Sequence, residues 1–386
     1  MANFFNANRT RFMENQRSLK VLQMLPALDA GGVERGTVEL AREIVARGHE
    51  SIVISNGGRL VSRLETEGSQ HIQMPVHRKS LASFFQVRSL RRLFQELKPD
   101  IIHVRSRVPA WIAYLAWRQM PIASRPRLVS TVHGMYSVNP YSAIMTKSEH
   151  IIAISDCVRE YILNNYQVSP EKITRIYRGL DPSVFNHGKT DESWLSQLYS
   201  DYPQLQGKRI ILMPGRLSRW KGQEAFLNVM QRLVQKHPEC HGVVIGEAES
   251  NKQHYLKELL DMRKDLGLES QVTFVGHRSD IHSFYALADI TCHLSNKEEP
   301  FGRTVPEALA CGSPVVAYDR GGASESLHLA FPEGLVEPDN PDAFASRISE
   351  ILGNPPTEIR LPEAFFLEHQ VEATLGVYYR LLSTPA

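Results

Sequence analysis

Two glutamates bracket a short glycine-bearing stretch in the second half of the chain, Glu299-Pro-Phe-Gly-Arg-Thr-Val-Pro-Glu307. Pro306 is tolerated only in the first turn of a helix, where its missing N–H is not needed. Glu307 is therefore predicted near a helix N-terminus, with Glu299 on the loop that faces it. Free N–H groups at such a terminus can bind a diphosphate. Two carboxylates beside that site suit a ligand with hydroxyls at both ends of a phosphate bridge, such as a nucleotide sugar.

The same spacing also has a purely structural interpretation. Acidic residues in a first helical turn are favoured by the helix dipole alone, and a loop–helix–strand passage is ordinary in α/β proteins. Two further features favour a functional site. Phe301-Gly302 lies between the glutamates, and the loop Gly321-Gly322-Ala-Ser-Glu325 follows the next predicted strand.

A basic loop follows an earlier predicted strand of the same half, in the run Met213-Pro-Gly-Arg216-Leu-Ser-Arg-Trp-Lys221. Arg216 would offer a planar fork and Lys221 a compact charge, a pair able to clamp a diphosphate. The alternative is a solvated basic loop. Because both loops follow strands of one predicted sheet, we expect them to open on the same edge, where α/β sheets bind ligands.

Two features of the first half are weaker signals. His133 follows a predicted strand, and Gly134 beside it would allow close backbone approach. Asp29-Ala-Gly31-Gly32 is either a simple tight turn or a loop that lets a ligand approach the backbone. Either feature could be purely structural.

These residues depend on a regular framework. Both halves alternate short apolar strands with longer helical patterns, which is typical of βαβ units and parallel sheets. Strands are predicted at 20–25, 51–54, 101–104, 128–132, 150–154 and 173–176, and again at 209–213, 242–245, 272–275, 290–293 and 315–317. The fold class is therefore predicted to be α/β, with a connection around 181–207 that contains some helix at 193–198.

The two halves differ in charge. Residues 1–190 carry 26 Lys and Arg against 15 Asp and Glu, whereas the remainder carries 18 against 27. This asymmetry supports two domains and gives the first an attraction to anionic surfaces. Within it, the segment Arg78–Lys98 combines apolar residues near helical spacing with basic residues on other faces. Core packing with a solvated basic face and docking on an anionic membrane both remain open.

Composition and the absence of certain motifs argue against several classes of protein. The sequence contains no run of about 18 apolar residues, so no membrane span is predicted. The opening residues lack the apolar core of a secretion signal. The four cysteines are scattered without metal-ligand spacing, as expected for free thiols in a reducing compartment. No Asp-x-Asp triplet, Walker loop or nucleic-acid motif occurs. A cytoplasmic protein without a metal, cofactor or nucleic-acid partner is predicted.

Together the motifs resemble the retaining glycosyltransferases of family 4 (glycosyltransferase group 1). The resemblance covers nearly the whole chain from about Lys20. It implies the GT-B fold, with two Rossmann-like doubly wound domains facing across a cleft. Residues 1–190 would form the acceptor domain and 191–366 the nucleotide-sugar donor domain. A helix at about 367–386 would pack back on the first domain.

The resemblance also implies roles for residues of the donor domain. Arg216 and Lys221 would bind the donor diphosphate without a metal, and Glu307 would bind the ribose hydroxyls. Glu299 would contact the transferred sugar. The remaining implied donor contacts are the backbone at Phe301 and Gly302, Arg303, and the glycine loop Gly31–Gly32, which would lie near the phosphates or the acceptor.

His133 resembles the family's first-domain histidine beside the transferred sugar, so His133 and Glu299 are the predicted catalytic residues. Arg178 stands where an asparagine is common, and Arg303 stands where a small or apolar residue is usual. The family retains anomeric configuration. Since no residue is a convincing covalent nucleophile, we expect same-face attack by the acceptor hydroxyl, aided by a departing phosphate oxygen.

The expected partners are a nucleotide sugar and a saccharide or lipid-linked acceptor, in bacterial lipopolysaccharide, O-antigen or capsule synthesis, with peripheral contact to the inner face of the cytoplasmic membrane. Three other functions compete with this one. A GT-B epimerase or sugar-nucleotide hydrolase shares the donor site. A dinucleotide oxidoreductase requires a G-x-G-x-x-G motif that neither glycine loop fits. A non-catalytic membrane-associated binding protein is disfavoured by the joint presence of both carboxylates and both cations.

Overall fold

The structure is a computed structural model that describes residues 17–29, 31–79, 85–188, 190–248 and 253–384. Ala30 of the glycine loop and residues 80–84 of the basic segment lie outside these ranges. The chain divides into two compact units, each described separately below. Unit 1 comprises Met1–Ile154, Arg159–Ile176 and Val371–Ala386, and unit 2 comprises Ser155–Val158 and Tyr177–Gln370.

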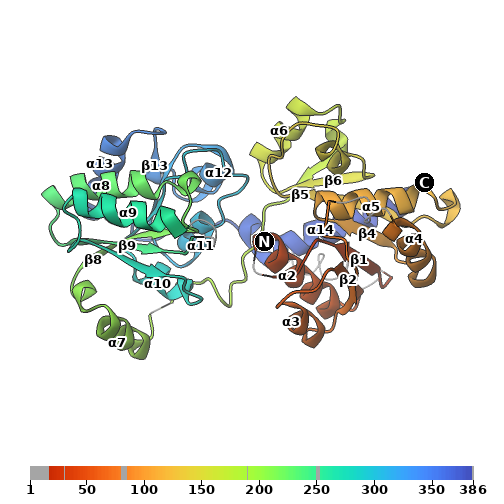
Figure 1. Ribbon diagram of the computed structural model, residues 1–386, viewed down its shortest axis with the longest axis horizontal. Coiled ribbons are helices and arrows are strands. Elements are labelled where there is room, and N and C mark those ends of the chain that lie inside the picture. The colour runs from red at the N-terminus through yellow and green to blue at the C-terminus, as the bar shows by residue number, and fades with distance from the viewer. Residues whose placement is uncertain (1–16, 30, 80–84, 189, 249–252, 385–386) are drawn as a thin grey trace, which may run out of the picture. The chain divides into compact units, whose positions relative to one another are not determined.

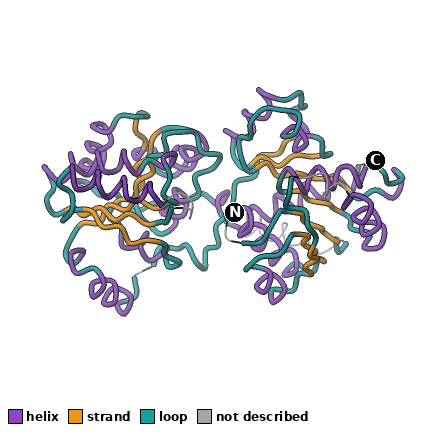
Figure 2. Tube along the Cα trace, in the orientation of Figure 1, coloured by secondary structure: helices purple, strands orange, loops and turns teal. Residues whose placement is uncertain are grey.

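Unit 1 is built on a seven-stranded parallel sheet of order β3-β2-β1-β4-β5-β6-β7 (Figures 1 and 2). Its strands are β1 (Lys20–Met24), β2 (Glu50–Ser55), β3 (Gln70–Gln73), β4 (Ile101–Val104), β5 (Arg127–Val132), β6 (His150–Ala153) and β7 (Ile173–Arg175). The central strands are mostly apolar and almost wholly buried, because helices cover a parallel sheet on both faces. All four residues of β4, for example, are buried.

The helices of unit 1 fill the crossovers between these strands. They are α2 (Gly32–Ala46), α3 (Val61–Thr66), α4 (Gln86–Leu97), α5 (Arg107–Arg118) and α6 (Asp156–Asn165), joined by the last helix of the chain, α14 (Leu367–Ser383). The first residues of α6, up to Val158, count with unit 2. The hydroxyl of Tyr378 on α14 lies 2.7 Å from Nδ1 of His103 on β4, and Nε2 of His103 lies 2.6 Å from the hydroxyl of Thr131 on β5. All three side chains are buried, so this chain of hydrogen bonds fixes α14 to the sheet.

Unit 2 repeats the plan with six parallel strands in the order β10-β9-β8-β11-β12-β13. The strands are β8 (Arg209–Pro214), β9 (Cys240–Ile245), β10 (Val272–Gly276), β11 (Ile290–His293), β12 (Val315–Tyr318) and β13 (Leu335–Val336). The helices are α7 (Glu192–Asp201), α8 (Gln223–Lys236), α9 (Gln253–Asp265), α10 (Ile281–Leu287), α11 (Thr304–Ala310), α12 (Gly321–Ala330) and α13 (Pro341–Gly353).

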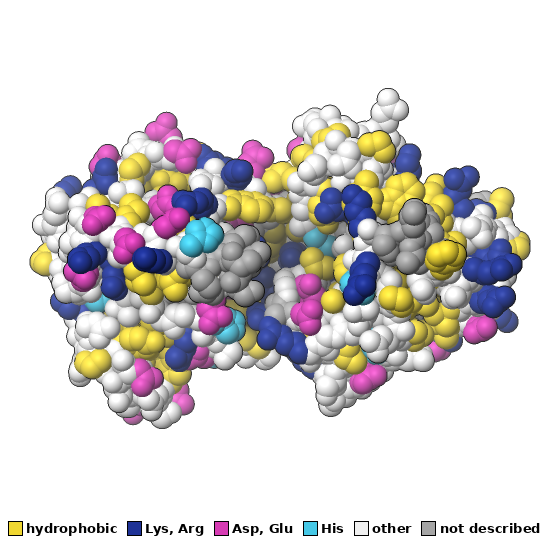
Figure 3. Space-filling model, viewed as in Figure 1, with side chains coloured by type: hydrophobic (Ala, Val, Ile, Leu, Met, Phe, Trp, Pro, Cys, Tyr) yellow, Lys and Arg dark blue, Asp and Glu magenta, His cyan; other side chains and the backbone are white. Residues whose placement is uncertain are grey.

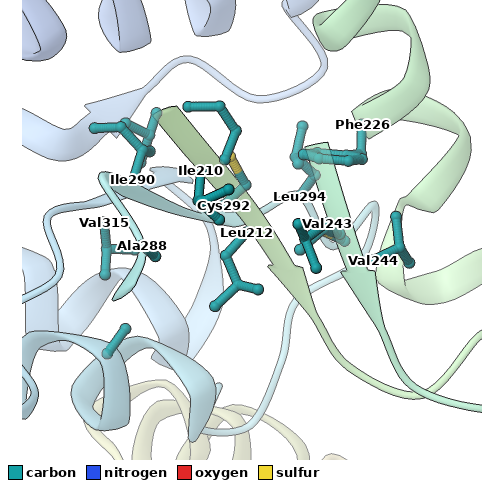
Figure 4. Packing of buried hydrophobic residues seen from close by; sticks show 14 of the residues in the cluster. Ile210, Leu212, Phe226, Val243, Val244, Ala288, Ile290, Cys292, Leu294 and Val315 are labelled. Atoms are coloured by element: carbon teal, nitrogen blue, oxygen red, sulfur yellow. The ribbon is translucent and has the colours of Figure 1, made fainter. Parts of the chain in front are cut away.

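The core of unit 2 lies between this sheet and its helices. Figure 4 shows Ile210 and Leu212 of β8 beside Val243 and Val244 of β9, with Phe226 of α8 packed against β9 at Gly242. All five side chains are buried. A rigid sheet of this kind holds the loops at its edges in fixed positions, so the loop residues act from a well-defined scaffold.

Each sheet has one point where the strand order reverses. In unit 1 it lies between β1 and β4, and in unit 2 between β8 and β11. Ligands of open α/β sheets bind outside the carboxyl ends of the strands at such a switch point. The predicted α/β class, with two doubly wound parallel sheets, is confirmed.

The chain passes from unit 1 to unit 2 after Ile176, earlier than the boundary predicted at 190. The residues that follow pair with the end of unit 2, since Leu180 forms a bridge with Phe366. From Val371 onward α14 counts with unit 1. Within the described ranges, no helix has both the length and the apolar character needed to cross a membrane.

Candidate active site

The switch point of unit 2 brings the basic and acidic loops together. Lys221 ends a short 3-10 turn that follows β8, and Glu299 lies on the loop that follows β11. Nζ of Lys221 lies 2.6 Å from Oε1 of Glu299. The two loops predicted to share one edge of the sheet therefore meet there.

Glu299 is buried and surrounded by polar groups. The hydroxyl of Ser295 also donates to its Oε1 atom, and Nε2 of His293 lies 3.4 Å from the same atom. Burial alone would raise the pKa of Glu299, but His293, the Lys221 ammonium and the hydrogen bonds from Lys221 and Ser295 outweigh it and lower the pKa to about 2. The side chain is therefore a fixed carboxylate at neutral pH.

His293 completes the floor of this site at the end of β11. Burial lowers its pKa; the Glu299 carboxylate opposes this effect and the Lys221 charge adds to it. The ring is consequently neutral at pH 7, and Lys221 supplies the positive charge that balances Glu299. Nδ1 of His293 lies 3.1 Å from the hydroxyl of Thr304, the first residue of α11.

The backbone around Glu299 is held by the predicted glycine loop. The N–H of Gly322 donates to the carbonyl of Glu299 at 2.7 Å. A Cβ atom at Gly321 would lie 2.8 Å from the nitrogen of Glu299, and one at Gly322 would overlap the carbonyl oxygen of Pro300. Glycine is thus required at both positions because the start of α12 packs directly on the backbone of the Glu299 loop.

Glu307 takes part in a separate ion pair. It is buried in the first turn of α11, as its position after Pro306 predicted. Nε of Arg303 donates to its Oε1 at 2.7 Å, and the hydroxyl of Tyr285 donates to its Oε2 at 3.2 Å. The two glutamates therefore differ in their cation: Lys221 for Glu299 and Arg303 for Glu307.

The other predicted donor residues of unit 2 lie on the same two loops, after β8 and after β11. Arg216 is exposed on the loop after β8. The ring of Phe301 is buried and packs with Tyr177 and Phe365, with centroid separations of 6.2 and 6.3 Å, so only the backbone of Phe301 is available at the site. Gly302 has a φ of 69° and packs against Ala323.

Three predicted site residues belong to unit 1. His133 is half-buried directly after β5, and the hydroxyl of Tyr136 forms a hydrogen bond with its backbone. Gly31 precedes α2 and Gly32 begins it. A Cβ atom at Gly31 would overlap the carboxylate of Glu34, so the close approach at this glycine is made by a side chain of the protein.

Sequence reasoning missed several residues of the site. In the sequence His293 only ends a predicted strand, and Ser295 and Tyr285 belong to no motif. The signal that could have identified His293 and Ser295 is their position at the carboxyl edge of the sheet, where ligands bind. Glu325, quoted only as part of a motif, accepts hydrogen bonds from the N–H groups of Asp156 and Cys157 at 2.8 and 2.7 Å and thereby caps the start of α6.

A cavity of about 480 Å³ in the same unit runs along β10 and α9 and reaches the loops that follow β8 and β9. Its lining includes Leu217, which directly follows Arg216, together with Gly246, Glu247, Phe274 and Gly276. Within the described ranges, no three His, Cys, Asp or Glu side chains gather closely enough to hold a metal ion.

Two doubly wound parallel sheets, the second with a cation–carboxylate site at its switch point, define the GT-B class of glycosyltransferase. Family models agree. "Glycosyl transferases group 1" matches residues 200–364, and "Glycosyltransferase Family 4" matches residues 30–184. The two models together match most of the chain, and the chain belongs to the group 1 glycosyltransferases.

Individual proteins show the same relationship. Spore coat protein SA of Bacillus subtilis is 25% identical over 364 residues, which cover 90% of this chain and 91% of that protein. The crystal structure of a glycosyltransferase from Rickettsia africae is 29% identical and matches 96% of this chain and all of its own, with a TM-score of 0.85. Anabaena Alr3699/HepE in complex with UDP-glucose is 23% identical, covers 95% of this chain and 99% of its own, and has a TM-score of 0.75.

Proposed function

We propose that this glycosyltransferase moves a hexosyl group from a nucleotide-diphosphate sugar to a hydroxyl of a saccharide or lipid-linked acceptor, with retention of configuration. The observation that carries the proposal is the Lys221–Glu299 pair at the switch point of unit 2. A donor contains both chemistries that such a pair recognises. Its diphosphate needs a cation, and its sugar hydroxyls need an acceptor of hydrogen bonds.

Departure of the nucleotide diphosphate builds negative charge on the leaving oxygen. Lys221 and Arg216 would stabilise this charge electrostatically, without a metal. Glu299 would accept hydrogen bonds from the sugar, and its low pKa supports this role because the carboxylate stays ionised throughout the working range. His133 would hydrogen-bond the transferred sugar, and the acceptor hydroxyl would attack on the face from which the phosphate departs.

The nucleoside would occupy the cavity beside Leu217. A volume of about 480 Å³ is in the range of small-molecule pockets. Glu307 would bind the ribose hydroxyls. Each of its two oxygens already accepts one hydrogen bond, and each carboxylate oxygen has a second lone pair for a ligand hydroxyl. The UDP-glucose complex of the Anabaena protein supports a nucleotide sugar as the donor class.

Unit 1 supports contact with an anionic membrane surface. Helix α4 buries Val87, Leu90 and Phe94, which leaves Arg88 and Arg92 exposed, and Phe85 before it is 81% exposed. Figure 3 shows Lys and Arg side chains gathered toward the end of unit 1 that holds α4. An apolar side chain beside cations suits the interface of an anionic bilayer. A lipid-linked saccharide of lipopolysaccharide, O-antigen or capsule synthesis, elongated at the inner face of the cytoplasmic membrane, fits this surface.

A panel of UDP-, GDP- and ADP-sugars tests the proposal. The true donor should raise the melting temperature of the protein, since a ligand bound only by the native state stabilises it. Consumption of that donor should then require an added acceptor. Consumption at the same rate without acceptor would indicate a hydrolase, and conversion to an isomeric sugar nucleotide would indicate an epimerase. Absence of any stabilisation by the whole panel would overturn the proposal in favour of a non-catalytic protein.

A further inference from the structure

Unit 1 contains a cationic and aromatic cluster at the carboxyl edge of its sheet that the donor site does not use. Arg107 begins α5, directly after β4. Its guanidinium carbon lies 4.5 Å from the ring centroid of Tyr136 and 5.3 Å from that of Tyr141, and its Nη1 atom donates to the hydroxyl of Ser142 at 3.2 Å. Both tyrosines lie on the loop after β5, the neighbouring strand.

A second cation reaches the same ring from a third loop. Nζ of Lys79, on the segment after β3, lies 4.3 Å from the centroid of Tyr141. Among the residues that the structure describes, no carboxylate forms an ion pair with Lys79 or Arg107. Two like charges around one ring without an acid repel each other, and an anionic ligand would relieve that repulsion.

The loop that carries the tyrosines is held in place from several sides. The indole N–H of Trp111 on α5 donates to the carbonyl of Tyr141 at 2.9 Å, and the hydroxyl of Tyr161 on α6 donates to the carbonyl of Tyr136. The N–H of Ser142 also donates to the side chain of Asn139 at 2.9 Å. The cluster is therefore ordered before any ligand binds, which reduces the entropic cost of binding.

The charge of Arg107 acts on the surrounding phenols. Burial raises the pKa of Tyr136, of Tyr141 and of Tyr166, and in each case Arg107 opposes the increase. The guanidinium thus sets a positive potential over the whole cluster. Such a potential attracts anions, whereas a neutral sugar gains nothing from it.

The geometry points to a subsite in which Lys79 and Arg107 bind the phosphate of a phosphorylated saccharide, with Tyr141 beside its sugar ring. A guanidinium fork and an ammonium together match the several oxygens of a phosphate, and an aromatic face packs against a sugar ring. The inference rests on the proposed function, because it assigns the phosphorylated saccharide to the acceptor. Whether the phosphate is free or part of a lipid-linked saccharide, its recognition chemistry is the same.

Calorimetric titration of the full-length protein with glucose 1-phosphate and with glucose, both in a saturating concentration of whichever of UDP, GDP and ADP binds, tests the subsite. We expect glucose 1-phosphate to bind and glucose not to bind measurably. Arg107→Gln and Lys79→Gln should each weaken glucose 1-phosphate binding by roughly tenfold or more, since each removes a charge-assisted hydrogen bond. Arg63→Gln, which removes a surface cation of α3 in the same unit, is the matched control and should have no effect.

The outcomes separate this subsite from the donor site. Equal binding by the wild type and Arg107→Gln would overturn the subsite, as would loss of glucose 1-phosphate binding in Lys221→Gln but not in Arg107→Gln. Failure of UDP, GDP and ADP alike to bind any of the proteins would contradict the proposed function instead. Arg107→Lys keeps the charge and should recover part of the affinity, which guards against a folding defect in Arg107→Gln.

Vesicles distinguish the two sources of phosphate. The probe is a phosphatidylcholine vesicle that carries phosphatidylinositol, in which a phosphate joins a ring of hydroxyls to the lipid. Arg107→Gln should bind these vesicles more weakly than Arg88→Gln does. Binding that falls equally in both variants and is abolished by salt would instead reflect general attraction to an anionic surface and would overturn the subsite for lipid-linked ligands.

Discussion

Lys221 and Glu299 are 78 positions apart in the sequence, yet they form a 2.6 Å ion pair that joins the loops after β8 and β11. Glu299 is 6% exposed, so solvent screens this pair only weakly. A diphosphate that bound Lys221 would have to compete with Glu299 for the same ammonium. Donor binding and the position of Glu299 are therefore coupled.

Replacement of Lys221 by alanine should lower the rate of sugar transfer by roughly 100-fold to 1000-fold, the usual effect of removing one preorganised electrostatic group. The measurement is the rate of nucleotide diphosphate release with donor and acceptor present. Arg219→Ala is the matched control, because Arg219 pairs with the exposed Glu224 and Glu258 and should be nearly neutral. Equal losses in both variants would show that Lys221 has no special role.

The unfolding free energy of the protein should depend on pH through Glu299. Its folded-state pKa, about 2, lies below the ordinary value of 4.5, so its contribution is complete above pH 4.5 and is lost as the pH falls toward 2. Between pH 6 and pH 3.5 the wild type should lose about 1.4 kcal/mol of unfolding free energy from this group. Denaturant titrations at the two pH values measure this loss. The fall in unfolding free energy should be smaller in Glu299→Gln than in the wild type by about that amount. Parallel pH profiles for the two proteins would contradict the ionised, paired state of Glu299.

The glycine loop offers a test of how the Glu299 loop is positioned. Gly322→Ala adds a methyl group that overlaps the carbonyl of Pro300, whereas Gly353→Ala adds one with no atom within 4 Å. We expect Gly322→Ala to displace the Glu299 backbone and to cost about 1–3 kcal/mol, as overpacking does, with a loss of transfer. Gly353→Ala should leave both properties unchanged. Normal donor turnover in Gly322→Ala would show that the close packing does not position the site.

Adjacent tyrosines of α14 provide a test of its attachment to unit 1. Tyr378→Phe leaves buried Nδ1 of His103 without its partner, and we expect a loss of about 1–3 kcal/mol in unfolding free energy. Tyr379 makes only long contacts, 3.4 Å to His49 and 3.5 Å to Arg17, so Tyr379→Phe should cost less than about 1 kcal/mol. Chemical denaturation measures both. Equal effects would mean that the buried hydrogen-bond chain contributes little.

The framework could be predicted from the sequence because buried parallel strands are apolar runs of fixed length. The strand predicted at 101–104 is β4, and the helix expected within 193–198 is α7. Strand β3 was missed because its sequence, Gln-His-Ile-Gln, is largely polar, as an edge strand allows. Strand β13 has only two residues and carries no detectable pattern.

The site was predicted only in part. Convergence of the Lys221 and Glu299 loops follows from strand order, since the carboxyl ends of parallel strands share one edge. The pairing of Arg303 with Glu307 could not be foreseen, because spacing along a helix does not decide which partner a side chain selects. For the same reason, the approach of the Glu34 carboxylate to Gly31 could not be foreseen.

The most direct test of the central claim is a calorimetric titration of UDP, GDP and ADP into the wild type and into Lys221→Ala, Arg216→Ala and Arg219→Ala. One nucleotide should bind the wild type and Arg219→Ala with equal affinity. It should bind Lys221→Ala and Arg216→Ala roughly tenfold or more weakly, because each variant lacks a charge-assisted contact to the diphosphate. Unchanged affinity in Lys221→Ala and Arg216→Ala would contradict a diphosphate site at the β8–β11 switch point.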